Sequence, residues 1–198
     1  MTLICLGDSL TFGYGVPRNH CWTSLVQKES GFRIVNMGIS GDTTGGMLTR
    51  LNTEILIDQS FHGFRENQPR VLLMGGANDI FYSGSSVAAR SNIGAMVHQL
   101  RARGSEPLVG IAPPPVLDRV PQNWAGILTA ETSAEVATYA EWLCRWCAVF
   151  SVQTIDFRPL FLTETGLPDA DAYLDGLHPN REGHARMAAK LANWLKES

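Results

Sequence analysis

The sequence predicts an α/β fold in which helices cover both faces of a parallel sheet. Short apolar runs alternate with longer segments of helical periodicity, and this alternation is typical of strand–helix–strand units joined by right-handed crossovers. The first of these runs, at residues 2–6, is almost entirely apolar, as in strands buried on both faces. Three of the runs lead directly into glycine and small polar residues, as at the carboxyl edge where such sheets form ligand sites. The five expected strands lie near residues 2–6, 33–37, 70–74, 107–112 and 152–156.

Five helices are expected between and after these strands. Gly104 stands where a glycine C-cap would end the third helix. The prolines at 113–115 must end the fourth strand, because proline cannot donate to a sheet ladder, and the connection 116–132 that follows is long. The last helix carries a stripe of small and aliphatic residues that should face the core. The expected helices span about residues 22–29, 43 or 44 to 57, 86–103, 134–150 and 181–196, while 11–17 and 58–69 read as irregular.

The composition is that of one soluble globular domain spanning residues 1–198. Of the 198 residues, 44% are hydrophobic and 18% are charged, which is enough apolar material for one sizeable core. The formal net charge is −3 and no block of lysine or arginine occurs, so nucleic acid is not an expected partner. No run approaches about 18 apolar residues, so stable membrane insertion is not expected. Because the first strand begins at once, we expect a cytoplasmic protein, or a periplasmic or secreted one if a leader was removed.

The four cysteines do not form a disulfide scaffold in a chain of this length. Cys5 lies in the first apolar run and is expected to be a small buried hydrophobe. Cys144 and Cys147 form a C-x-x-C motif, which no second motif of that spacing accompanies. Since helical periodicity explains Cys147 as a core residue, we expect no metal or redox site there.

The motif Gly7-Asp8-Ser9-Leu10 follows the first strand and places a hydroxyl nucleophile candidate at the sheet edge. The same residues also suit an ordinary turn, so the motif needs further groups to indicate catalysis. Near the end of the chain, Asp175-Gly176-Leu177-His178 supplies a base and an acid that could orient it. A turn at Gly176 would let Asp175 fold back onto the imidazole, and Pro179 holds His178 outside the following helix.

The other four histidines lack an acidic neighbour at a comparable spacing and are interpreted as structural or surface residues. They are His20, His62, His98 and His184.

An acyl-transfer site also needs donors for the developing oxyanion. The glycine-dense stretch 38–46 follows the second strand, and Asn78 follows the third. Backbone N–H groups at Ser9 and Gly41, together with the Asn78 carboxamide, would form such an oxyanion hole. Gly38 precedes Gly41 by three residues, so either glycine could supply the N–H.

Taken together, these motifs make the chain similar to the GDSL esterases, also called SGNH hydrolases. The resemblance is strongest to bacterial acylhydrolases of the thioesterase I/lysophospholipase type. It implies a three-layer α/β/α sandwich, Ser9 as nucleophile, His178 as base, Asp175 as its orienting partner, and Gly41 rather than Gly38 beside Asn78 in the hole. Asp8 and Asp79 are interpreted as scaffold residues that bond nearby backbone. The motifs that carry the resemblance, in order, are Gly7-Asp8-Ser9-Leu10, Ile39-Ser40-Gly41-Asp42-Thr43, Gly76-Ala77-Asn78-Asp79 and Asp175-Gly176-Leu177-His178.

The hypothesis that follows is hydrolysis of a small-molecule ester through an acyl-enzyme, a mechanism that requires no cofactor or metal. The ester could equally be a thioester, a lysophospholipid, an aryl ester or an acetylated sugar. The alternative is a non-catalytic, flavodoxin-like module that binds phosphate or a nucleotide through its glycine-rich loops. Candidate pocket residues are Tyr14, Phe81, Tyr82, Leu117, Trp124, Ile127 and Leu128.

Overall fold

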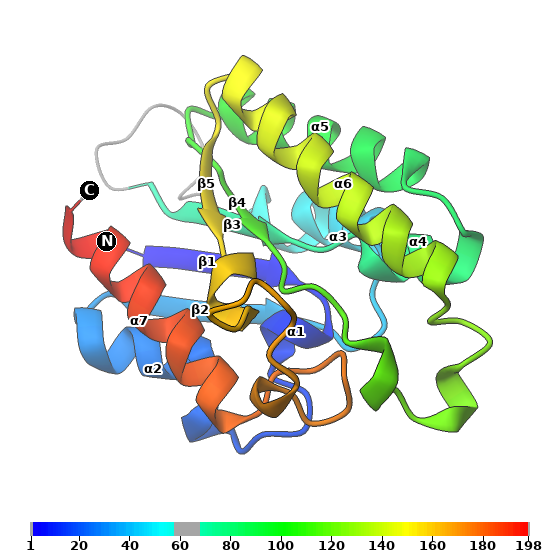
Figure 1. Ribbon diagram of the computed structural model, residues 1–198. Helices are drawn as coiled ribbons and strands as arrows, with labels where there is room; N and C mark the ends of the chain where they lie inside the picture. The colour runs from blue at the N-terminus through cyan, green and yellow to red at the C-terminus, as the bar shows by residue number, and fades with distance from the viewer. Residues whose placement is uncertain (1, 58–67, 198) are drawn as a thin grey trace.

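The computed structural model describes residues 2–57 and 68–197, and it has the predicted five-stranded parallel sheet (Figure 1). The strand order is β2-β1-β3-β4-β5, so the chain moves from β1 outward to β2 and then returns to the other side of β1. The carboxyl ends of β1 and β3 thus form the point where the winding reverses, which is where open α/β sheets bind ligands. The strands are β1 Thr2–Gly7, β2 Arg33–Gly38, β3 Arg70–Met74, β4 Leu108–Ile111 and β5 Gln153–Asp156.

Helices cover both faces of the sheet, which makes the three layers visible in Figure 1. Along β1, Leu3 and Cys5 pack into the core on the side of α2 and α7, whereas Ile4 and Leu6 pack into the core beneath α3, α5 and α6. Both faces of the central strand are therefore buried, which explains its continuous apolar run. The helices at the five predicted positions are α2 Trp22–Ser30, α3 Thr44–Arg50, α5 Val87–Ala102, α6 Ala130–Val149 and α7 Arg181–Glu197.

Two helix boundaries differ from the prediction. The helix α6 begins four residues earlier than expected, because Thr129 and Thr132 form a reciprocal capping box at its start. The helix α3 ends at Arg50 and continues as a π-helical turn, Leu51–Ile55, so the expected helix to residue 57 is nearly complete. Gly104 follows α5 with φ of +79°, as predicted for a C-cap glycine. The expectation of an irregular stretch at 58–69 lies mostly outside the described residues.

Two short helices stand where the sequence predicts loops. The helix α1, Ser9–Phe12, starts directly after β1, and α4, Ala77–Ser83, starts directly after the turn that follows β3. Neither is long enough to show helical periodicity in the sequence. The helix α1 begins with Ser9, and α4 carries Asn78 in its first turn, so both helices place residues that the sequence predicts for the site. Single 3-10 turns occur at Arg18–His20, Leu117–Arg119, Gln122–Trp124, Arg158–Phe161 and Ala170–Ala172.

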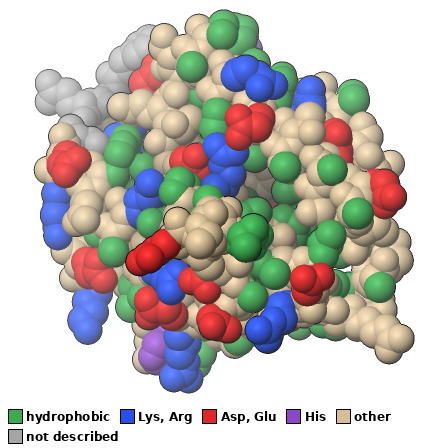
Figure 2. Space-filling view, in the orientation of Figure 1, with side chains coloured by type: hydrophobic (Ala, Val, Ile, Leu, Met, Phe, Trp, Pro, Cys, Tyr) green, Lys and Arg blue, Asp and Glu red, His purple; other side chains and the backbone are tan. Residues whose placement is uncertain are grey.

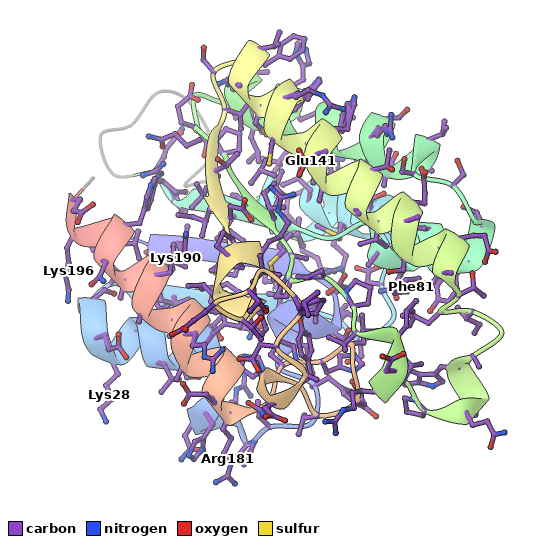
Figure 3. The ribbon with its side chains drawn as sticks, viewed as in Figure 1. Lys28, Phe81, Glu141, Arg181, Lys190 and Lys196 are labelled. Atoms are coloured by element: carbon purple, nitrogen blue, oxygen red, sulfur yellow. The ribbon has the colours of Figure 1, made fainter. Side chains whose placement is uncertain are left out.

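The face seen in Figure 2 mixes charged side chains of both signs, in keeping with the absence of basic blocks from the sequence. Lys28 extends from α2 away from the molecule, and Lys190 and Lys196 lie on α7 (Figure 3). Within residues 2–57 and 68–197, no helix is long and apolar enough to cross a membrane. In the same residues no cluster of His, Cys, Asp or Glu could hold a metal ion, and Cys5 and Cys147 are buried free thiols.

His184, on α7, is a fully buried histidine with a strongly altered proton affinity. Its Nδ1 accepts a hydrogen bond from the Trp22 main-chain N–H at 3.3 Å, and no protein group pairs with its Nε2 in the described residues. Burial, together with the nearby charge of His178, lowers the pKa of His184 to about 4. The ring is therefore neutral in the folded protein at neutral pH, and protonation favours unfolding. This environment agrees with the interpretation of His184 as a structural residue.

We expect His184 to make the folded state sensitive to mild acid. Between about pH 6.5 and 4 the His184 side chain is protonated in the unfolded chain and neutral in the folded protein. The contribution of neutral His184 to the free energy of unfolding is therefore full above about pH 6.5. It falls by about 3 kcal/mol as the pH is lowered to about 4. His184→Asn keeps an acceptor for Trp22 and removes the titration. Urea unfolding of both proteins at several pH values should show the wild type losing stability relative to the variant across that range.

The buried carboxyl of Asp8 changes stability with pH in the opposite direction to His184. Asp8 is present in both the wild type and His184→Asn. Burial raises the pKa of its carboxyl to about 6, so stability is lost as the pH rises from about 4 to 6. This contribution cancels when wild type and His184→Asn are subtracted at each pH. A stability difference that stays constant from pH 7 to about pH 4 would contradict the assignment to His184.

Candidate active site

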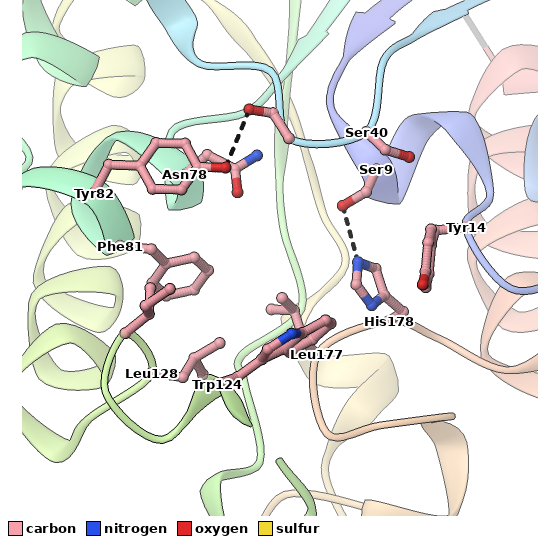
Figure 4. Close-up of a pocket in the computed structure, with 12 residues that line it drawn as sticks. Ser9, Tyr14, Ser40, Asn78, Phe81, Tyr82, Trp124, Leu128, Leu177 and His178 are labelled. Atoms are coloured by element: carbon pink, nitrogen blue, oxygen red, sulfur yellow. Dashed lines mark hydrogen bonds between the residues drawn. The ribbon is translucent and has the colours of Figure 1, made fainter. Parts of the chain in front are cut away.

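Ser9 is the first residue of α1, at the point where the chain turns sharply out of β1. The Asp8 side chain caps this helix, since its Oδ1 accepts from the Leu10 N–H at 2.9 Å. This is the scaffold role that the sequence predicts for Asp8. The turn leaves Ser9 only 8% exposed, with its hydroxyl directed toward His178 at the carboxyl edge of the sheet (Figure 4).

The loop before α7 folds Asp175 back onto His178, as the sequence predicts. Gly176 has φ of +79°, and a Cβ there would lie 2.4 Å from the Val116 carbonyl oxygen, so glycine is required at the turn. One Asp175 oxygen, Oδ1, accepts from the main-chain N–H groups of Leu177 and His178 at 3.1 and 2.8 Å. The other, Oδ2, lies 2.8 Å from His178 Nδ1. The carboxylate thus fixes both the loop and the ring.

His178 connects this loop to Ser9. Its Nε2 lies 3.0 Å from Ser9 Oγ, although the two residues are 169 positions apart in the chain (Figure 4). Burial raises the pKa of Asp175, but hydrogen bonds from the His178 ring and main chain outweigh burial and hold that pKa below its ordinary value. Since the ionised carboxylate can only accept, Nδ1 carries the proton in the neutral ring and Nε2 accepts from the Ser9 hydroxyl.

The glycine-rich loop after β2 brings Gly41, and not Gly38, to the site. The Gly38 N–H donates to Asn36 Oδ1 at 2.9 Å, and a Cβ on Gly38 would lie 2.1 Å from the Phe12 main-chain nitrogen. Gly41 has φ of +80° and lines the same pocket as Ser9 and His178. Of the two candidate glycines, the structure therefore leaves Gly41 with access to the pocket.

Asn78 reaches the pocket from the first turn of α4. Its Nδ2 donates to the Asp42 carbonyl oxygen at 2.8 Å, which fixes the carboxamide and uses one of its two N–H donors. Asp79 has the scaffold role that the sequence predicts, although its partner is distant in the chain. It accepts from the Thr44 N–H at 2.9 Å and from the Thr44 hydroxyl at 2.6 Å, so it fastens α4 to the start of α3.

The pocket beside Ser9 is a cavity of about 260 Å³ with a mostly apolar wall. The Tyr14 ring lies 4.4 Å from the His178 ring and Trp124 meets it edge-on at 5.6 Å, so two aromatic side chains flank the imidazole. Of the candidate pocket residues, Leu117 is the one that does not line this cavity; Ser40 and Leu177 line it without having been predicted. The wall comprises Ser9, Tyr14, Ser40, Gly41, Asn78, Phe81, Tyr82, Trp124, Ile127, Leu128, Leu177 and His178.

Sequence reasoning also missed a polar network behind the pocket. Arg50, at the end of α3, forms an ion pair with Asp42 at 2.6 Å, and both side chains are largely buried. A signal for it is present in the sequence, since Arg50 falls on the helix face that carries Met47 and Leu51. A charged residue on an apolar face is seldom buried unless it is paired.

Comparisons with known proteins show the family to which the chain belongs. The sequence profile of the GDSL-like lipase/acylhydrolase family matches residues 5–186. Thioesterase 1/protease 1/lysophospholipase L1 of Escherichia coli is 28% identical over 98% of this chain and 83% of its own length, and an arylesterase of Vibrio mimicus is 28% identical over 98% and 87%. A solved G-D-S-L family lipolytic protein from Veillonella parvula superposes with a TM-score of 0.78 at 22% identity, covering 100% of both chains. The chain therefore belongs to the GDSL-like lipase/acylhydrolase family and is an ester-hydrolysing enzyme.

Proposed function

We propose that Ser9, His178 and Asp175 form a catalytic triad that hydrolyses carboxylic esters through an acyl-enzyme. The observation that carries this proposal is the continuous chain of contacts from Ser9 Oγ to His178 Nε2 at 3.0 Å and from His178 Nδ1 to Asp175 Oδ2 at 2.8 Å. Serine is a weak nucleophile unless a neighbouring base takes its proton, and an oriented imidazole is such a base. Family membership supports this reaction over the alternative of a non-catalytic phosphate-binding module.

In the first half of the reaction, Ser9 Oγ attacks the carbonyl carbon of the ester while its proton passes to His178 Nε2. The ionised Asp175 stabilises the resulting imidazolium. The tetrahedral intermediate then collapses, the bond to the leaving oxygen breaks, and the imidazolium gives its proton to that oxygen. The products of this half are the free alcohol and an ester between the acyl group and Ser9.

In the second half, a water molecule takes the place of the alcohol. His178 Nε2 accepts a proton from the water as the water oxygen attacks the acyl carbon. The bond to Ser9 Oγ breaks, and the imidazolium returns the proton to the serine. The acid leaves and the enzyme is restored, so no other reactant is consumed.

The developing oxyanion needs donors that are already in place, and we assign the Ser9 and Gly41 N–H groups and the second Asn78 N–H to this role. Asn78→Ala should lower kcat by about 10² to 10³ with a small change in KM, because the donor acts mainly in the transition state. Asn52→Ala is the matched control, since Asn52 also donates to a main-chain carbonyl but lies on the surface. Equal kcat values for Asn78→Ala and Asn52→Ala on p-nitrophenyl butyrate would show that Asn78 is not an oxyanion donor.

The substrate class follows from the pocket wall. Within the described part of the chain, no lysine, arginine, aspartate or glutamate lines the cavity, whereas Phe81, Trp124 and Leu128 do. A neutral apolar acyl or aryl group would gain about 25 cal/mol for each Å² of surface that it buries there. The substrate is therefore a small ester with a neutral, apolar group next to the carbonyl or the leaving oxygen.

Pre-steady-state hydrolysis of p-nitrophenyl acetate and butyrate tests the proposal. An acyl-enzyme that accumulates releases a burst of p-nitrophenol equal to the concentration of active sites before the slower steady state begins. If the burst is absent because deacylation is the faster step, added methanol should still divide a common acyl-enzyme between acid and methyl ester, in one ratio for phenyl and p-nitrophenyl butyrate. A ratio of products that changes with the leaving group would contradict a common acyl-enzyme.

A further inference from the structure

Arg50 is a buried cation that the reaction above does not use. It is 9% exposed on the last turn of α3, next in space to the fully buried Met47 and Leu51. Placing a guanidinium in such surroundings is costly unless its donors are partnered. The partners that Arg50 has therefore identify what its charge holds together.

The partners of Arg50 lie at the carboxyl ends of β1 and β2 and in the loop that follows β2. Nη2 donates to the Gly7 carbonyl oxygen at 3.1 Å, directly before Asp8 and Ser9, and Nη1 donates to the Met37 carbonyl oxygen at 2.8 Å. Nε and Nη2 both donate to Asp42 Oδ2, at 3.0 and 2.6 Å. One planar group thus fixes the carboxyl ends of β1 and β2 relative to the loop that carries Gly41.

The same contacts extend to the third oxyanion donor. Asp42, whose side chain Arg50 binds, uses its main-chain carbonyl to accept the Asn78 carboxamide at 2.8 Å. Each of the three assigned donors is therefore within two residues or one hydrogen bond of a group that Arg50 holds. Among residues 2–57 and 68–197, Arg50 is the one arginine that is buried.

We infer that Arg50 is a positioning residue that pre-organises the oxyanion hole by fixing the Ser9 turn, the Gly41 loop and Asn78 relative to one another. The inference rests on the proposed function, because it concerns donors that act only if an oxyanion forms at Ser9. Donors of this kind are effective when they are held where the charge will develop, and displacement by about 1 Å can cost about 10²-fold in rate. Arg50 touches neither substrate nor reacting atoms in this assignment.

Arg50→Lys tests the inference, since one ammonium cannot reproduce the planar fork that reaches three partners. We expect kcat to fall by about 10- to 100-fold, with KM changed less than about threefold, because the loss falls on the transition state. The affinity for an alkylboronic acid, which forms a tetrahedral adduct with the serine, should fall by a similar factor. Rates are normalised to active sites by the acyl-enzyme burst or by labelling with an organophosphate.

Arg101→Lys is the matched control. Arg101 also binds one carboxylate, that of Glu106, and two main-chain carbonyls, those of Phe150 and Ser151, but it does so at the opposite edge of the sheet. It should lower the melting temperature without changing kcat by more than about twofold. If Arg50→Lys behaves in the same way as this control, Arg50 contributes only stability and the inference is wrong.

Asp42→Asn provides a second variant if Arg50→Lys does not fold. It keeps the main-chain carbonyl that accepts Asn78 and removes the charge that Arg50 binds, so it should reproduce the loss of kcat. The double variant should lose little more than either single variant, because both act through one contact. Unchanged kcat in Asp42→Asn would overturn the inference. A wild type that lacks Ser9-dependent hydrolysis would instead overturn the proposed function itself.

Discussion

Replacing Ser9 by alanine is expected to lower kcat for p-nitrophenyl butyrate by about 10⁶-fold. The substitution removes the atom that attacks the ester, and His178 at 3.0 Å then has no hydroxyl to activate. Removing the serine or the histidine of a serine triad usually costs about as much as removing the whole triad, because the two act as a unit. The weak activity that remains should come from the oxyanion donors and from binding alone.

Ser24→Ala serves as the control for this substitution, since Ser24 lies on α2 and away from the pocket. It should keep the wild-type kcat within about twofold. Both variants should fold, because each substitution removes one hydroxyl group. The main-chain hydrogen bonds that form α1 do not involve the Ser9 side chain. A Ser9→Ala protein that keeps more than about a tenth of the wild-type kcat would exclude Ser9 as the nucleophile.

Asp175→Asn should lower kcat by about 10⁴-fold, which is the second-largest effect that we expect. The asparagine carboxamide can present an N–H to His178 Nδ1, and the neutral ring then carries its proton on Nε2. In that tautomer Nε2 cannot accept the proton of Ser9. The steady-state kcat at neutral pH, measured beside the wild type, tests this directly.

The loop should survive the change, because the asparagine Oδ1 can still accept from the Leu177 and His178 N–H groups. Asp169→Asn is the matched control: Asp169 also caps a turn through its Oδ1 and pairs with a cation, Arg186, at 2.7 Å, but it does not line the pocket. We expect Asp169→Asn to change stability and to leave kcat nearly unchanged. If Asp175→Asn retained kcat within about tenfold of the wild type, His178 would need no orienting carboxylate.

The sheet was predictable because burial on both faces leaves a clear record in the sequence. In the third strand, residues 71–74 are apolar at every position, and the structure places all five strands within one or two residues of the prediction. The short helices α1 and α4 were not predictable. Helices of four and seven residues owe their stability to caps and tertiary packing, as with Asp8 at α1, and not to any periodicity.

The site residues that directly follow strands could be predicted from the sequence. Those whose role depends on contacts between elements distant in the chain could not. Ser9, Asn78 and the turn at Gly176 could be read from motifs at strand or helix ends. Arg50 could not, because its role depends on the approach of β1, β2 and the Gly41 loop in space. The choice between Gly38 and Gly41 likewise depends on the Asn36 side chain, which occupies the Gly38 N–H. The single domain and the cytoplasmic location stay predictions.

The most direct test of the account is the site at which a mechanism-based inhibitor attaches. Diethyl p-nitrophenyl phosphate transfers its phosphoryl group to an activated serine and releases p-nitrophenol, so intact mass and peptide mapping can locate the adduct. We predict one diethylphosphoryl group per chain, on Ser9, with ester hydrolysis lost in proportion to labelling and no adduct on Ser9→Ala. Stoichiometric labelling of another residue, or full hydrolysis by a protein fully labelled at Ser9, would contradict the assignment of Ser9 as the nucleophile.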